Sequence, residues 1–195
     1  GFQAKALWIS AAFVAPLALM LYFLWISASA QVTFAESERQ GLTYTRPVLD
    51  LVRAAQTRRQ SAVMKAADLP EQQNRVKAAF DKVLAQNNAL GKAFGTQEAF
   101  AALAKAHEDL MRAPQAATPD ATYEAHTAYL GAALDLASAI ANGSNLALDP
   151  DLDTYHLMNF SVLLGPQQYE NVARLGTLGS LVLGSKELSA GRRDL

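Results

Sequence analysis

Arginines are the residues with the clearest chemical potential in this chain. Arg39, Arg46 and Arg53 lie seven residues apart, which places them on one face of a helix, and Arg58 and Arg59 follow one to two turns later. A guanidinium presents a planar fork of donors that matches a carboxylate. We therefore expect Arg53, Arg58 and Arg59 to contribute to a ligand site. The alternative is a solvated face, or arginines paired with acids on neighbouring helices.

A second polar group follows residue 148. Asp149, Asp151 and Asp153 alternate, as carboxylates that bind Ca²⁺ can, but the glycine and distal glutamate of an EF-hand loop are absent. Capping of a helix N-terminus explains them without a metal. We include Tyr155 and His156 among the candidate ligand-binding residues, with packing between helices as the alternative.

Catalytic and metal-binding patterns are weak. His107, His126 and His156 fall on three different predicted helices, without the paired spacing of a helical metal site. The sequence has no phosphate-binding Gly-Lys loop and no nucleophile elbow. We expect no catalytic residue, no metal and no cofactor, and no enzymatic activity.

The element that must position these side chains starts with an apolar run. Ala6 to Ile26 contains no charge, and at about 1.5 Å per residue such a helix crosses a hydrocarbon core of about 30 Å. The Ala28-Ser29-Ala30 triplet also fits a signal-peptide cleavage site, but the run is longer than such peptides use. Lys5 precedes the run, which favours a cytoplasmic N-terminus. We predict a transmembrane anchor over residues 1–29.

The remaining residues, 30–195, have an all-α pattern. Alanine is abundant, period-2 alternation is absent, and net charge is −1 with both signs interspersed, which argues against nucleic acid as a partner. Apolar spacing predicts a first helix continuing from the span through Pro47, followed by helices at Glu71–Arg112, Pro119–Ala141 and Asp149 to about Gly184. Caps are expected at Asp68 or Leu69, at Thr118 and at Asp149, a left-handed end at Gly143, and a kink at Gly165-Pro166. Four such helices predict an up-down four-helix bundle.

Two stretches resemble the ligand-binding region of bacterial methyl-accepting chemotaxis proteins. Residues 38–47 (ERQGLTYTRP) look like the helix that follows the first span, and residues 145–158 (NLALDPDLDTYHLM) are similar to the start of the last sensor helix. The resemblance implies a homodimeric periplasmic sensor in the bacterial inner membrane, within a receptor that continues beyond Leu195. It also implies a small-molecule ligand, with carboxylates clamped by arginines.

Three outputs stay open for a chain of this pattern. A chemoreceptor is the first interpretation. The same sensor type also precedes histidine kinases and diguanylate cyclases. A membrane-anchored helical adaptor that binds a protein partner is the alternative from a different class.

Overall fold

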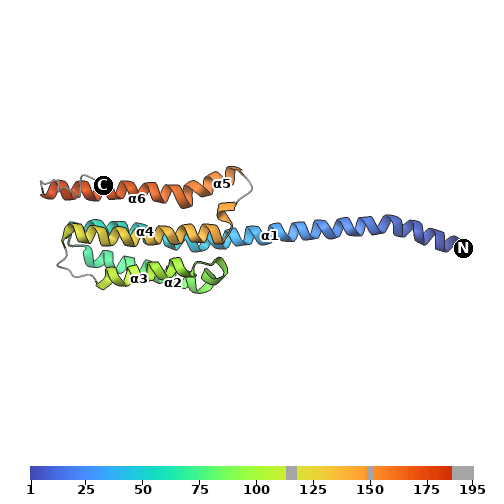
Figure 1. The fold of residues 1–195 in the computed structure, drawn as a ribbon, viewed down its shortest axis with the longest axis horizontal. Helices are drawn as coiled ribbons and strands as arrows, with labels where there is room; N and C mark the ends of the chain where they lie inside the picture. The colour runs from blue at the N-terminus through green and yellow to red at the C-terminus, as the bar shows by residue number, and fades with distance from the viewer. Residues whose placement is uncertain (113–117, 149–151, 186–195) are drawn as a thin grey trace. The chain divides into compact units, whose positions relative to one another are not determined.

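The computed structural model describes residues 1–112, 118–148 and 152–185, and within them it is helical without strands. This confirms the all-α prediction. Figure 1 colours the chain from blue at the N-terminus to red at the C-terminus. Besides α-helices, the described residues form a short 3₁₀ turn (η1) and a π-helical segment (η2). In chain order the elements are α1 Phe2–Val63, α2 Leu69–Phe94, α3 Gln97–Arg112, α4 Pro119–Gly143, η1 Leu146–Leu148, α5 Leu152–Met158, η2 Asn159–Leu164 and α6 Gly165–Ser185.

Helix α1 carries the apolar run predicted from the sequence. Its N-terminal part is long and apolar enough to cross a membrane, and none of that apolar window is buried against other residues of the chain. Intrachain contacts divide the chain into two units, Gly1–Arg39 and Gln40–Leu195. Length and composition therefore support a membrane span in the first unit, and the second unit holds the candidate ligand-binding residues Arg53, Arg58, Arg59, Tyr155 and His156.

The core of the second unit forms where α1, α2, α3 and α4 pack together. On α1, Tyr44, Val48, Leu51 and Ala55 recur every three or four residues and are fully buried, which fits the first helix predicted to continue through Pro47. Residues from the other three helices complete this cluster: Val76, Val83, Leu103, Leu110, Tyr129, Leu130, Ala133, Leu136 and Ile140. Burial of such aliphatic and aromatic side chains is the main favourable term in folding.

The prediction of one helix over Glu71–Arg112 is wrong. Gly95 adopts a left-handed conformation with φ of 66°, and its N–H donates to the Gly91 carbonyl, which ends α2. The chain then reverses into α3, so the Phe80 ring stacks on His107 with centroids 3.9 Å apart. Because this hairpin adds a helix, the expected four-helix up-down bundle is not confirmed by the structure.

The ends of α4 follow local chemistry, with one correction. Thr118 caps the N-terminus by accepting a hydrogen bond from the Ala121 N–H (3.2 Å), as predicted. At the other end, the left-handed residue is Asn145, with φ of 67°, and Gly143 remains helical. The predicted cap at Asp149 and Pro150 lies outside the described residues.

The last helix contains an irregularity beside its proline. Residues of η2 are π-helical immediately before Gly165-Pro166, and the Gly165 N–H donates to the Phe160 carbonyl. Proline lacks an N–H and its ring collides with the carbonyl four residues earlier, so a wider turn upstream relieves the clash. The helix therefore continues into α6, which lies along α4 (Figure 1).

Helices α5, η2 and α6 carry apolar side chains that are exposed to solvent, of which Phe160 and Val172 also line grooves against α1. Each is more than half exposed: Leu157, Phe160, Leu164, Val172, Leu175 and Leu183. We call this set the outer apolar row.

Close approach of two helix ends makes a glycine necessary at position 143. A Cβ on Gly143 would collide with the carbonyl oxygen of Phe94, which is backbone and cannot rotate away. We expect Gly143→Ala to lower the free energy of unfolding by about 1–3 kcal/mol. A Cβ on Gly131, in the same helix, meets nothing within 4 Å. Gly131→Ala should therefore raise stability by about 0.5–1 kcal/mol.

Urea titrations followed by circular dichroism at 222 nm, with the chain in detergent micelles, measure both variants. Equal effects of the two substitutions would contradict the close packing of α2 and α4 at their C-terminal ends.

Candidate functional site

Arg59 belongs to a buried ionic network that joins three helices. Its Nη1 and Nη2 donate to the two carboxylate oxygens of Glu170 on α6 at 2.6 and 3.2 Å, and its side chain is fully buried. Gln56 Nε2 donates to the same carboxylate at 2.8 Å, and the guanidinium stacks over the Tyr123 ring of α4. The guanidinium of Arg59 is thus occupied by a carboxylate that the chain itself supplies.

Arg58, one residue earlier, has a different environment. It is 7% exposed, and its Nη1 lies 2.5 Å from Nε2 of His126 on α4. Its Nε, like that of Arg59, is buried without a hydrogen-bond partner among the described residues. Unlike Arg59, Arg58 has no described acid within salt-bridge distance of its guanidinium. Arg58 therefore keeps a buried positive charge that no described carboxylate balances.

The His126 ring is held in one tautomer. Its Nδ1 donates to the Thr122 carbonyl at 2.7 Å, so its Nε2 is left to accept from Arg58. Burial, together with the neighbouring charges of Arg58 and Arg59, lowers the pKa of His126 to about 4. At neutral pH the ring is uncharged and offers a single acceptor.

Arg58 and His126 line a cavity of about 530 Å³ between the C-terminal end of α1 and the adjacent ends of α2, α3 and α4. We call it the distal cavity. Its volume falls within the range of about 300–1,000 Å³ usual for small-molecule sites. Among the described residues of the lining, Arg58 and Lys65 are cationic and none is acidic. The others are Ala62, Val63, Ala66, Ala67, Leu69, Pro70, Gln73, Leu110, Met111, Pro119, Ala121, Thr122, Ala125 and His126.

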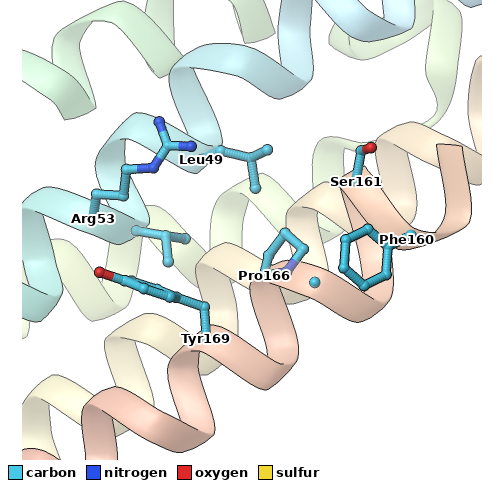
Figure 2. A pocket seen from close by; sticks show the side chains of 8 residues that line it. Leu49, Arg53, Phe160, Ser161, Pro166 and Tyr169 are labelled. Atoms are coloured by element: carbon cyan, nitrogen blue, oxygen red, sulfur yellow. The ribbon is translucent and has the colours of Figure 1, made fainter. Parts of the chain in front are cut away.

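Arg53 lies elsewhere, at a groove of about 400 Å³ between α1 and the start of α6. In Figure 2, Arg53 and Leu49 of α1 lie opposite Phe160, Pro166 and Tyr169. The Arg53 guanidinium donates to Asp50 at 3.0 Å, and both side chains are mostly exposed. The structure does not bring Arg53 together with Arg58.

The remaining predicted site residues are also separate from the distal cavity. Tyr155 packs against the small cluster around Met158 and Val162, and its ring meets that of His156 edge-on, which is itself exposed. Arg39 pairs with Glu36 on the exposed surface, and Arg46 is exposed.

The three histidines do not form a site. The Nδ1 of His107 lies 3.0 Å from the Tyr129 hydroxyl, and burial lowers its pKa. His126 contacts Arg58, and His156 contacts Tyr155. The described residues contain no group of three or more His, Cys, Asp or Glu side chains that could hold a metal ion.

Sequence reasoning singled out Arg58 and Arg59 but missed the partners that distinguish them. His126 and Glu170 are 68 and 111 residues away from their respective arginines. A signal for Glu170 was present: it is an acid in a helix otherwise dominated by apolar and small residues, where a charge requires a partner.

Comparison of the chain with protein-family models, with curated proteins and with solved structures gives no match.

Removal of one partner of the Arg59–Glu170 pair should strongly lower the free energy of unfolding. Glu170→Ala leaves Arg59 buried without a carboxylate, and we expect a loss of about 3–5 kcal/mol in the free energy of unfolding. Urea titration by circular dichroism measures it. The matched control is Glu71→Ala, whose pair with Arg75 is exposed and should cost less than about 1 kcal/mol.

A double variant tests the cause. Arg59→Met combined with Glu170→Met removes both charges and should recover much of the loss. A double variant as unstable as Glu170→Ala would show that the cost arises from shape and not from the stranded charge.

Acid should destabilise the fold through His126. The pKa of His126 is about 4 in the folded chain and about 6.5 in the unfolded chain. At pH values between these two, the unfolded chain therefore binds a proton that the folded chain does not bind. The free energy of unfolding should therefore decrease as pH falls from about 6.5 to about 4, by about 3 kcal/mol in total. Stability at pH 5 and pH 7 measured for His126→Gln should differ less than in the parent chain. His156→Gln, on the exposed surface, is the control and should keep the parental difference.

Proposed function

We propose that this chain is the extracytoplasmic sensing region of a bacterial transmembrane signalling receptor, of the methyl-accepting chemotaxis type. In this proposal the apolar part of α1 spans the inner membrane and the helical unit from Gln40 onward lies in the periplasm as a sensor bundle. The distal cavity receives a small solute.

The observation that carries the proposal is the position of Arg58. The helix that bears the apolar segment also supplies the buried guanidinium that lines the distal cavity. A solute that binds there contacts α1 itself together with the adjacent ends of α2, α3 and α4. A ligand shifts a conformational equilibrium when it binds the two states with different affinity. Because several helices line this cavity, a state in which one of them moves would present a different lining to the ligand and bind it with different affinity.

The resemblance of residues 38–47 and 145–158 to chemoreceptors supports this class over others. Histidine kinases and diguanylate cyclases use the same kind of sensor, and they differ in the output domain to which the sensor is joined. The proposal concerns the sensing step, which these receptors share.

The outer apolar row favours a second candidate function, a membrane-anchored adaptor. Contiguous exposed apolar side chains commonly mark protein interaction surfaces. An adaptor would use Phe160, Val172 and Leu175 for a protein partner and would have no need of the cavity.

Thermal unfolding in the presence of a solute panel tests the proposal. The panel comprises amino acids, amines, sugars and organic acids, each added to the chain in detergent micelles at constant ionic strength. A solute present at 100 times its Kd should stabilise the folded chain by about 2.7 kcal/mol, seen as a higher Tm.

The expected stabilisation should weaken in Ala125→Leu, which fills space in the distal cavity, and should persist in Ser161→Leu, which lies at the groove of Figure 2. If no solute raises the Tm, small-molecule sensing by this region is contradicted and the adaptor becomes the better account.

A further inference from the structure

We propose that the groove of Figure 2 is a second binding site, whose ligand is a small uncharged aromatic molecule with one hydrogen-bond donor, such as an aromatic alcohol or an indole. The groove has a volume of about 400 Å³ and lies between α1 and the segment that joins η2 to α6. Among the described residues, it shares no lining residue with the distal cavity. The inference therefore goes beyond the proposed sensing of a solute in that cavity.

A backbone carbonyl without a helical donor carries the inference. The Gly165 N–H, which would reach the Ser161 carbonyl in an α-helix, donates instead to the Phe160 carbonyl. The next backbone nitrogen, which would reach Ser161 in a π-helix, belongs to Pro166 and has no hydrogen. The helix therefore supplies no N–H to the Ser161 carbonyl in either register. Ser161, Gly165 and Pro166 all line the groove.

The surface around this segment is built from flat rings. The rings of Phe160, Pro166 and Tyr169 lie on the α6 side of the groove (Figure 2). Phe160 and Tyr169 are 67% and 62% exposed, so most of their apolar surface is available to a ligand. Leu49 and Val52 of α1 complete the apolar lining. An aromatic ring that enters the groove buries apolar area against both helices.

The lining carries no net charge. Arg53 is the one charged side chain among the described residues of the lining, and its guanidinium donates to Asp50 on the same helix at 3.0 Å. This pair is mostly exposed and leaves no charge for a ligand to balance. A carboxylate or an ammonium group would lose hydration in the groove without gaining a free partner. The groove therefore favours an uncharged ligand.

The Ser161 carbonyl distinguishes one uncharged aromatic molecule from another. An O–H or N–H of the ligand replaces the water that it displaces from this carbonyl. A methyl group at the same place removes the water and leaves the carbonyl unpaired, which costs free energy. On a purely apolar surface the opposite holds, because an added methyl group strengthens binding. An aromatic alcohol that binds more tightly than its methyl ether therefore identifies the hydrogen bond.

The experiment is equilibrium dialysis at pH 7 with two matched pairs of probes, 2-naphthol with 2-methoxynaphthalene and indole with 1-methylindole. The full chain in detergent micelles is on one side, and protein-free micelles at the same detergent concentration are on the other. Partition into detergent then cancels, and the excess of probe measures binding to the chain. We expect 2-naphthol and indole to bind at least fivefold more tightly than their methylated counterparts. The anion 2-naphthoate should not displace bound 2-naphthol.

Variants locate the binding. Ser161→Leu fills the groove from an exposed position and should weaken 2-naphthol at least tenfold, whereas Ala125→Leu in the distal cavity is the control and should change its affinity less than twofold. Pro166→Ala restores an N–H that the Ser161 carbonyl can accept. In this variant the preference for 2-naphthol over its methyl ether should fall below twofold. Tyr169→Phe removes a hydroxyl but keeps the ring, and should keep the preference.

The contrary outcomes are distinct from failure of the sensing function. A methyl ether that binds as tightly as 2-naphthol overturns the inference, and so does a 2-naphthol affinity that survives Ser161→Leu. Absence of binding by both pairs overturns it as well. If Ser161→Leu then changes the mass of the chain measured by light scattering, a second copy occupies the groove in place of a ligand. None of these results bears on stabilisation by a solute through the distal cavity.

Discussion

The buried ion pair between Arg59 and Glu170 is the constraint on which the arrangement of the second unit depends. Two charges taken out of water cost several kcal/mol each, and their attraction offsets this only in good geometry. Here the carboxylate accepts two bonds from the guanidinium and a third from Gln56. A shift of α6 by one residue along α1 would remove all three bonds while leaving the charges buried. The pair therefore defines one register for α6, which apolar packing around Leu181 and Val63 alone would specify less strictly.

That register has a consequence for the neighbouring residue. Successive side chains on a helix are separated by about 100°, so consecutive arginines on α1 face different surroundings. Arg59 faces α6, where an acid meets it, and Arg58 faces His126 and the distal cavity. His126 and Thr127 are likewise consecutive on α4 and contact Arg58 and Arg59 respectively. The cavity and the ionic network thus share one turn of α1 and one turn of α4.

The parts of this fold that the sequence predicted are those encoded locally. Three predictions each depend on residues a few positions apart: the uncharged run from Ala6 to Ile26, the continuation of the first helix through Pro47, and the Thr118 cap. The prediction of one helix over Glu71–Arg112 failed because helical apolar spacing runs through two glycines that can also end a helix. The pattern around Gly91 and Gly95 indicates a weak point within one helix, whereas the left-handed φ of Gly95 ends it and allows Phe80 to stack on His107. The candidate site was predicted only in part because residue type identified Arg58 and Arg59 as basic, while their opposite environments come from partners on α4 and α6.

The difference between the two arginines also explains why a histidine suits position 126. A carboxylate there would neutralise Arg58, and a lysine would repel it. A neutral imidazole holds the guanidinium in place and leaves its charge uncompensated, provided that the ring stays unprotonated. Burial of the ring, together with the two nearby guanidinium groups, lowers the pKa of His126 to about 4, which keeps it neutral through the ordinary pH range. An unbalanced buried cation destabilises the fold at Arg58. The residues around Arg58 therefore maintain this imbalance.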